Sequence, residues 1–485
     1  MMNLKSLAKD TAIYGLSSIV GRFLNYLLSI LYLYKIPAES GGYGIVTHLY
    51  AWAGFLLALL TFGMETTFFR FSGKEEEDAD TVFSSSLKMV AGVGLAFVAL
   101  VFCFIRPLSS ALGYALHPEY IGCFALIVAM DAFQAILFAR LRQQKKALKF
   151  VGLKLTFIFT SILLNLFVFL VLPKLFPAHP ALESFFVSMD YGVGLIFFIN
   201  LFCTFIVNFG FLPELKIAFG GKMDGGLCRR MLAYSWPLLL LSLVGLLNQV
   251  ADKMLFPVLM PGPEGQVQLG IYGGCVKVAM IMALLTQAFR YAYEPIVFGG
   301  GRNRESVQTL ADGMKYFIVF SLLAYMAVIF YMPILKYMVG SGYREGLGVV
   351  PVVMAAEVFM GIYFNLSFWY KLSDQTWWGA VLSAIGAVVM IGINVIFVPR
   401  LGYWACAWGG FAGYGVPMVL SWIIGQKKYP VPYDGRCIGF FFLLALLNLG
   451  VSLLFRELPV WAQLAIDTVL LLEYCYFIYR KLIAK

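Results

Sequence analysis

Long apolar runs recur along the whole chain, and short stretches rich in proline, glycine and charged residues separate them. A helix that crosses a lipid bilayer needs roughly 20 consecutive apolar residues, because the hydrocarbon core is about 30 Å thick. Inside lipid, the backbone N–H and C=O groups must form their hydrogen bonds within the protein, and an apolar run of this length forms them as an α-helix. The sequence therefore predicts an all-α polytopic membrane protein.

Fourteen transmembrane helices are expected from these runs. Their predicted limits are 11–34, 45–64, 84–105, 120–141, 150–172, 185–209, 231–255, 270–292, 314–335, 349–370, 377–398, 403–424, 438–455 and 460–479. Composition agrees, since 61% of the 485 residues are hydrophobic and only 13% are charged, against about 25% charged residues in soluble domains.

Charge distribution predicts the orientation of the chain. Most Lys and Arg residues fall in the N-terminus, the C-terminus and the loops on the same side, whereas few fall in the opposite loops. Cytoplasmic loops carry such an excess of basic residues. Both termini are therefore expected in the cytoplasm, and the net charge of +10 reflects membrane topology. We expect no nucleic-acid partner.

The only long polar stretch, residues 211–230, divides six spans from eight. It predicts an N-terminal lobe over 1–215, a cytoplasmic linker over 216–230, a C-terminal lobe over 231–430 and two appended helices over 431–485. The fold would then consist of two six-helix lobes facing one another across a central polar cavity.

An internal repeat supports two lobes. In each half a Tyr-Gly pair precedes a glutamate at the same spacing; the copies are Tyr43, Gly44 and Glu65, and Tyr272, Gly273 and Glu294. All three positions are related by one constant offset, which we call the repeat offset. Because six crossings return the chain to its starting side, the two copies would be parallel repeats.

Polar side chains inside the predicted spans are the candidate binding residues, since a charge at mid-bilayer costs roughly 2.5–3.5 kcal/mol by insertion scales. The candidate cavity residues are Arg22, Asn25, Asn248, Asp252, Lys277 and Arg290. For the polar residues of the first span, the alternative role is hydrogen bonding between helices. For Arg290, the alternative is an interfacial ion pair with Glu294.

Two acids near mid-span, Asp131 and Glu357, suggest charge compensation or coupling to Na⁺ or H⁺, because desolvation favours the protonated carboxyl. The basic stretch 140–149 fits either membrane anchoring or a phosphate-attracting patch. Histidine and cysteine spacings match no metal site. We expect no metal, no cofactor and no catalytic residues.

Several short motifs carry a family resemblance. They are the segment 7–16 before the first span, Gly41-Gly42-Tyr43-Gly44 before the second, and Tyr234-Ser235-Trp236-Pro237 with Asp252-Lys253 in the seventh. With fourteen spans and a break after the sixth, the chain resembles bacterial polysaccharide flippases, the O-antigen type translocases of the multidrug/oligosaccharidyl-lipid/polysaccharide (MOP) exporter superfamily.

This resemblance implies a cationic cavity between two bundles in the bacterial inner membrane. It implies alternating access that moves an undecaprenyl-diphosphate-linked oligosaccharide from the cytoplasmic to the outer leaflet, with a glycan polymerase or ligase as partner. A monomer is expected. The alternatives are a cation-coupled multidrug exporter of the same superfamily, which favours acids in its cleft, and a membrane-bound glycan ligase or polymerase, which needs a large outer loop.

Overall fold

The computed structural model describes residues 24, 26–299 and 304–484. Within these residues the secondary structure is helical, without β-strands, which confirms the all-α prediction. Twelve described helices are long and apolar enough to span a membrane, and a bent pair raises the number to thirteen. Most of the first predicted span lies outside the described residues, although residues 26–35 are helical. The protein is a polytopic membrane protein with about fourteen helices.

The chain divides into two compact units, residues 1–270 and 271–485. The boundary falls inside α12 (Pro263–Gly299). The seventh predicted span, α11 (Gly225–Leu259), packs on α2 and α3 and belongs to unit 1. The lobe boundaries expected from the sequence, 1–215 and 231–430, remain a prediction.

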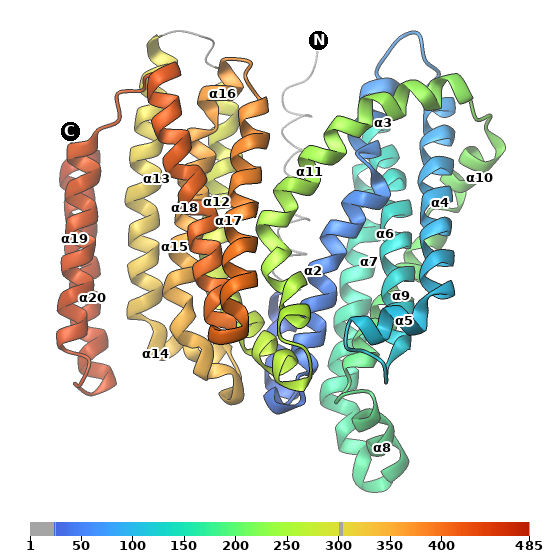
Figure 1. The fold of residues 1–485 in the computed structure, drawn as a ribbon, viewed down its shortest axis with the longest axis horizontal. Coiled ribbons are helices and arrows are strands. Elements are labelled where there is room, and N and C mark those ends of the chain that lie inside the picture. The colour runs from blue at the N-terminus through green and yellow to red at the C-terminus, as the bar shows by residue number, and fades with distance from the viewer. Residues whose placement is uncertain (1–23, 25, 300–303, 485) are drawn as a thin grey trace. The chain divides into compact units, whose positions relative to one another are not determined.

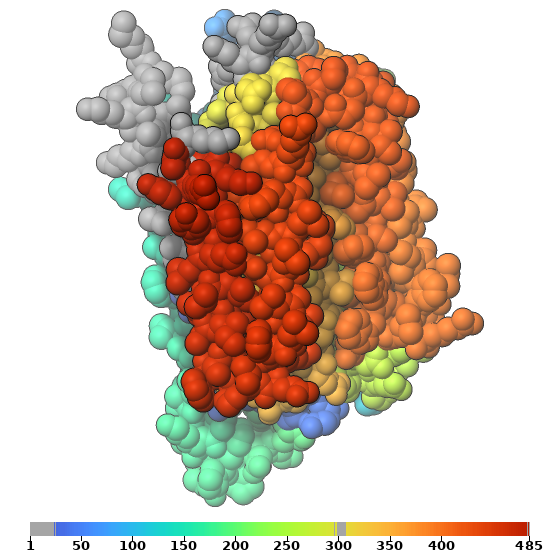
Figure 2. Space-filling view, turned by 90° about the vertical axis from the view of Figure 1, so that its left-hand side faces the viewer, coloured from blue at the N-terminus to red at the C-terminus, as the bar shows by residue number. Residues whose placement is uncertain are grey.

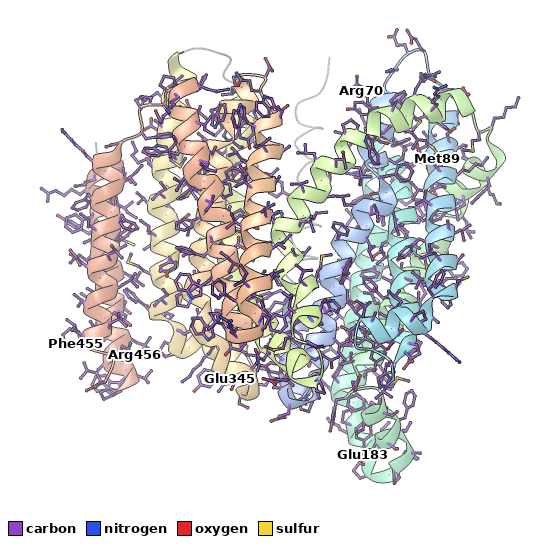
Figure 3. The ribbon with its side chains drawn as sticks, viewed as in Figure 1. Arg70, Met89, Glu183, Glu345, Phe455 and Arg456 are labelled. Atoms are coloured by element: carbon purple, nitrogen blue, oxygen red, sulfur yellow. The ribbon has the colours of Figure 1, made fainter. Side chains whose placement is uncertain are left out.

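Unit 1 is built on helices that pack in pairs: α4 with α6, α6 with α2 and α9, and α7 with α9. Figure 1 shows α8 beyond the end of this bundle, far from α3, and Figure 3 places Arg70 and Glu183 at these opposite ends. The helices of unit 1 are α2 (Gly42–Thr61), α3 (Met64–Ser72), α4 (Ala79–Cys103), α5 (Ile105–Ala111), α6 (Pro118–Gln143), α7 (Ala147–Leu166), α8 (Pro180–Ser188), α9 (Val193–Phe209), α10 (Leu212–Gly220) and α11, with short helices η1 (Ala38–Ser40), η2 (Phe167–Val171) and η3 (Leu172–Ala178).

In unit 2, α18 packs on both α15 and α17, while α13 packs on α15 and on the last two helices, α19 and α20. Figure 2 shows this C-terminal pair, in dark red, along one side of unit 2. The elements are α13 (Arg304–Phe330), α14 (Met332–Leu335), η4 (Lys336–Met338), η5 (Ser341–Val349), α15 (Val350–Leu366), α16 (Phe368–Leu372), α17 (Trp377–Leu401), α18 (Tyr403–Lys428), α19 (Gly435–Leu454), α20 (Val460–Ile478) and η6 (Tyr479–Ile483).

The sixth span differs from the prediction of one helix over 185–209. Its chain bends by 85° between α8 and α9. Asp190, Tyr191 and Gly192 all have positive φ there, and Asp190 accepts a hydrogen bond of 3.0 Å from Tyr120. Left-handed backbone cannot continue an α-helix, so the second helix of the pair, α9, begins only at Val193.

The polar stretch 211–230 is not an open linker. It contains α10, which packs on α4, and its buried Glu214 accepts hydrogen bonds of 2.9 Å and 2.6 Å from Lys149 Nζ. α11 starts at Gly225, ahead of the predicted start at residue 231. Pro237, expected in the first turn of this span, therefore lies inside the helix, where it removes one backbone hydrogen bond.

A close approach explains the glycine of the Tyr43-Gly44 motif. A Cβ atom on Gly44 would lie 1.9 Å from the backbone oxygen of Gln266 at the start of α12. No side chain fits at that distance. The first turn of α2 therefore packs directly on the α12 backbone within unit 1.

Candidate functional site

The structure distributes the predicted cavity residues over both units. Arg22 and Asn25 lie outside the described residues. Asn248 and Asp252 lie on α11 in unit 1, whereas Lys277 and Arg290 lie on the part of α12 that belongs to unit 2. Asp131 is near the middle of α6, and Glu357 is near the middle of α15. Each unit is therefore described separately.

In unit 1, Asp252 is buried and forms an ion pair with its neighbour, Lys253. Lys253 Nζ lies 3.0 Å from Asp252 Oδ2, and the backbone N–H of Lys253 donates to Asp252 Oδ1 at 2.8 Å. Sequence spacing places neighbours about 100° apart on a helix, which predicts that Lys253 points away. Its long side chain instead curls back, so the two charges compensate one another.

Met254, which follows Lys253 on α11, contacts the buried side chain of His48. His48 on α2 has 0% of its surface exposed, and its Nε2 lies 3.2 Å from the Met254 carbonyl oxygen. Its Nδ1 lies 2.5 Å from the Tyr114 hydroxyl, and the Trp52 indole N–H lies 3.0 Å from Nε2. Burial also raises the pKa of Tyr114, in the segment between α5 and α6. This polar cluster joins α2 to α11.

Asp131 faces a cation within the same unit. It interacts electrostatically with Lys154 on α7, whose ammonium lies 4.1 Å from the centre of the Phe138 ring. The sequence predicts that Lys154 snorkels from the start of its span. The helix begins at Ala147, however, which places Lys154 two turns inside it. A carboxylate and an ammonium thus occupy adjacent helices of the bundle.

The basic stretch 140–149 is largely paired with carboxylates. Arg140 pairs with Asp80, Arg142 pairs with Glu65, and Lys149 pairs with Glu214. Arg142 also lies over the Phe69 ring, with its Cζ 5.1 Å from the ring centre. These pairs connect α6 and the start of α7 to α3, α4 and α10, so these three cations link helices within unit 1. Membrane anchoring and phosphate attraction both stay predictions for this stretch.

In unit 2, Arg290 lies in a cluster of charges around an aromatic ring. Its Nε lies 3.4 Å from Glu294 Oε1, and its Cζ lies 4.9 Å from the centre of the Phe364 ring. Lys371 on α16 approaches the same ring, with its Nζ 4.9 Å from the centre, and lies 5.0 Å from the Phe368 ring. Sequence reasoning missed Lys371, although the repeat offset relates it to Arg142.

The Phe364 and Phe368 rings belong to a wider hydrophobic cluster that is rich in aromatic rings and includes Tyr293, Val431 and Tyr433; we call it the aromatic cluster. Val431 and Tyr433 also line a cleft of about 560 Å³. Most of its lining side chains are apolar, and Gln426 and Tyr433 add an amide and a hydroxyl. The cleft is lined by Met314, Ile318, Ile362, Leu366, Met418, Val419, Trp422, Gln426, Val431, Pro432, Tyr433, Gly435 and Ile438.

Lys277 and Glu357 complete the predicted set in unit 2. Both side chains are half-buried. α12 begins at Pro263, so Lys277 lies about 21 Å along the helix axis from its start. It is therefore well inside a membrane-spanning segment, as the sequence predicts. Its role in binding stays a prediction.

Comparison with solved structures identifies the fold. The lipid II flippase MurJ, in an inward closed conformation, is 17% identical, with a TM-score of 0.67 over 97% of this chain and 99% of that protein. An inward-facing multidrug resistance MATE family transporter of the MOP superfamily is 16% identical, with a TM-score of 0.64 over 84% of this chain and 94% of the transporter. The chain therefore shares its fold with these two proteins.

Sequence comparison identifies the family. No curated protein matches the sequence. A family model described as "Polysaccharide biosynthesis protein" matches residues 7–292, which is more than half of the chain. This multi-pass membrane protein therefore belongs to the polysaccharide biosynthesis protein family.

Proposed function

We propose that this protein is a flippase for an undecaprenyl-diphosphate-linked oligosaccharide. It moves this glycolipid from the cytoplasmic to the outer leaflet of the bacterial inner membrane by alternating access, for the synthesis of O-antigen, capsule or exopolysaccharide. The family match and the fold shared with a lipid II flippase support the proposal. The side chains that unit 2 brings together also support the proposal.

The observation that carries the proposal is that a mostly apolar cleft and two cations share one aromatic cluster. Val431 and Tyr433 line the cleft and also pack in the cluster, while Arg290 and Lys371 lie over its rings. A polyprenyl chain needs an apolar cleft, and a diphosphate needs cations in surroundings of low dielectric constant, where charge-assisted contacts are strong. The unit supplies both chemistries.

Cavity cations would hold the diphosphate during translocation. Arg22 and Lys277 are the candidates because each lies well inside a membrane-spanning segment of the sequence. Asn25 and Asn248 would contact the glycan, for which amide groups are suitable hydrogen-bonding partners, and Asp252 would line the same cavity. Asp131 and Glu357 would compensate charge or couple transport to Na⁺ or H⁺.

The orientation of the chain follows from its basic loops. Both termini, the end of α12 and the end of α16 would face the cytoplasm. The protein would act as a monomer that hands its substrate to a glycan polymerase or ligase. It would perform no chemistry on the glycan itself.

The test measures in which leaflet the lipid-linked oligosaccharide resides in cells depleted of this protein. We expect the glycolipid to accumulate in the cytoplasmic leaflet, and complementation with the wild-type gene to restore its delivery. Arg22→Ala and Lys277→Ala variants should fail to complement while inserting at normal levels. Normal delivery by both variants would exclude these residues as diphosphate ligands. Normal delivery in depleted cells, together with lost drug resistance, would favour a multidrug exporter.

A further inference from the structure

Two cations share one aromatic ring at the end of unit 2 where α16 lies (Figure 1). Arg290 Cζ and Lys371 Nζ each lie 4.9 Å from the centre of the Phe364 ring. Cation–π attraction holds each of them near the ring. Lys371 also interacts electrostatically with Arg290, so two like charges lie near the same ring.

Glu294 is the carboxylate that faces these two cations among the described residues. It lies 3.4 Å from Arg290 Nε, and Lys371 interacts electrostatically with both Glu294 and Arg290. One acid cannot neutralise two bases, so this group of three residues keeps a surplus positive charge. Arg290 has 53% of its side chain exposed, which leaves its guanidinium open to an incoming anion.

The repeat provides an internal comparison in unit 1. The repeat offset relates Glu65 to Glu294 and Arg142 to Lys371, and it also relates the last residues of α6 and α16. Glu65 and Arg142 form an ion pair, and at the equivalent positions of unit 2 Glu294 interacts electrostatically with Lys371. At the position equivalent to Arg290, however, unit 1 has Thr61. Lys154 also interacts electrostatically with Glu65, Arg142 and Asp131, so two carboxylates face two cations in unit 1, whereas one carboxylate faces Arg290 and Lys371 in unit 2.

We propose that Arg290 and Lys371 form a binding site for the diphosphate of a polyprenyl lipid, with Glu294 occupying the cations when no lipid is bound. This site rests on the proposed function and adds Lys371 to the residues that bind the substrate. The planar guanidinium of Arg290 can contact phosphate oxygens bidentately, whereas the Lys371 ammonium acts as a compact point charge. The aromatic cluster connects the site to the apolar cleft, where the lipid chain would lie.

The test measures binding of undecaprenyl diphosphate to the purified full-length protein in detergent. Charge-assisted contacts contribute about 1.5–3 kcal/mol, so Arg290→Gln and Lys371→Gln should each weaken binding by roughly tenfold or more. The same substitutions should reduce the affinity for undecaprenyl phosphate less than the affinity for undecaprenyl diphosphate. The wild type should bind inorganic pyrophosphate more weakly than undecaprenyl diphosphate. Lys371→Arg should retain binding.

Three variants serve as matched comparisons. Lys427→Gln removes a cation near the end of α18 and should leave affinity unchanged. Arg142→Gln removes the equivalent cation of unit 1 and should also leave affinity unchanged. Glu294→Gln frees both cations of unit 2, so affinity should stay equal or increase.

The outcomes separate this site from the proposed function. If the wild type binds undecaprenyl diphosphate and both glutamine variants at 290 and 371 bind it equally well, the site is wrong and the flippase proposal stands. Equal weakening by Glu294→Gln and Lys371→Gln would indicate a structural ion pair and would also overturn the site. If the wild type binds undecaprenol as tightly as the diphosphate, both proposals fail. Should Lys371→Gln not fold, the exposed Arg290→Gln carries the test.

Discussion

Glu214 on α10 is only 2% exposed, and it accepts hydrogen bonds of 2.9 Å and 2.6 Å from the ammonium of Lys149 at the start of α7. This ion pair fastens the short helix between α9 and α11 to the body of unit 1. A buried acid of this kind depends on its partner, because an unpaired charge in the interior is costly.

Glu214→Ala should therefore destabilise unit 1. The variant leaves Lys149 without its carboxylate and removes two charge-assisted hydrogen bonds, but Lys149 is about one third exposed and can turn toward water. We expect a loss of about 1–3 kcal/mol, measured by thermal unfolding of the purified protein. Lys216→Ala, at an exposed position of the same helix, should change little. An unchanged melting temperature in Glu214→Ala would show that α10 docks without this pair.

Gly44→Ala tests the close packing of α2 on the start of α12. The new Cβ would meet the Gln266 backbone oxygen at 1.9 Å, so one backbone must move. Overpacking of this kind typically costs about 1–3 kcal/mol. Gly54→Ala is the matched control in the same helix, because a Cβ atom at Gly54 would have nothing within 4 Å. Equal melting temperatures for the two variants would contradict the tight contact.

The limits of most spans were predictable because apolar runs and helices coincide. The eleventh and twelfth spans were predicted to begin at residues 377 and 403, which are the first residues of α17 and α18. Hydropathy fails where a helix continues beyond the apolar run. α11 and α12 have 35 and 37 residues, and their polar ends give no apolar signal. The bend at residues 189–192 also escapes hydropathy, since it depends on backbone dihedral angles.

The candidate site was predictable only in part. Individual charges inside apolar runs are visible in the sequence, and Arg290 with Glu294 was found through its i, i+4 spacing. Lys371 escaped notice because it follows the apolar run of its span, where a lysine usually marks the membrane edge. Its contacts with the Phe364 and Phe368 rings depend on how α16 packs against the end of α15. The repeat offset from Arg142 was the one available signal.

The helix cap formed by Asp78 should make the folding stability of the protein depend on pH in the acidic range. Its carboxylate caps α4 by accepting hydrogen bonds from the Thr81 N–H at 2.9 Å and the Thr81 hydroxyl at 2.7 Å. These bonds lower the pKa of Asp78 below its ordinary value of 3.8. The folded state therefore holds this proton less tightly than the unfolded state, so the contribution is present above pH 3.8 and is lost as pH falls through the folded pKa.

Asp78→Asn isolates this contribution, because asparagine is an equally good helix cap and does not titrate. Thermal unfolding is compared between wild type and variant from pH 6 to pH 3. We expect the wild type to lose more stability than Asp78→Asn below about pH 4, and Asp78→Ala to be less stable than both at pH 6. Identical pH profiles for wild type and Asp78→Asn would exclude the cap as a titrating group.

A double-mutant cycle on Asp131 and Lys154 distinguishes charge compensation from ion coupling. The two groups interact electrostatically across α6 and α7. Asp131→Asn leaves the Lys154 charge without its carboxylate in a membrane-spanning helix, so it should destabilise the fold more than Asp131→Asn combined with Lys154→Gln. Directly interacting pairs show coupling of about 0.5–3 kcal/mol. Lys145→Gln, which removes an exposed cation after α6, serves as the control.

Both stability and delivery of the lipid-linked oligosaccharide are measured for these variants. If Asp131 compensates charge, the double variant regains both, because no charge is left unpaired. If Asp131 instead carries a coupling ion, the double variant regains stability, yet delivery stays low and no longer responds to the Na⁺ or H⁺ gradient. We expect the first result, since Lys154 already lies opposite the carboxylate and would compete with a bound cation for it.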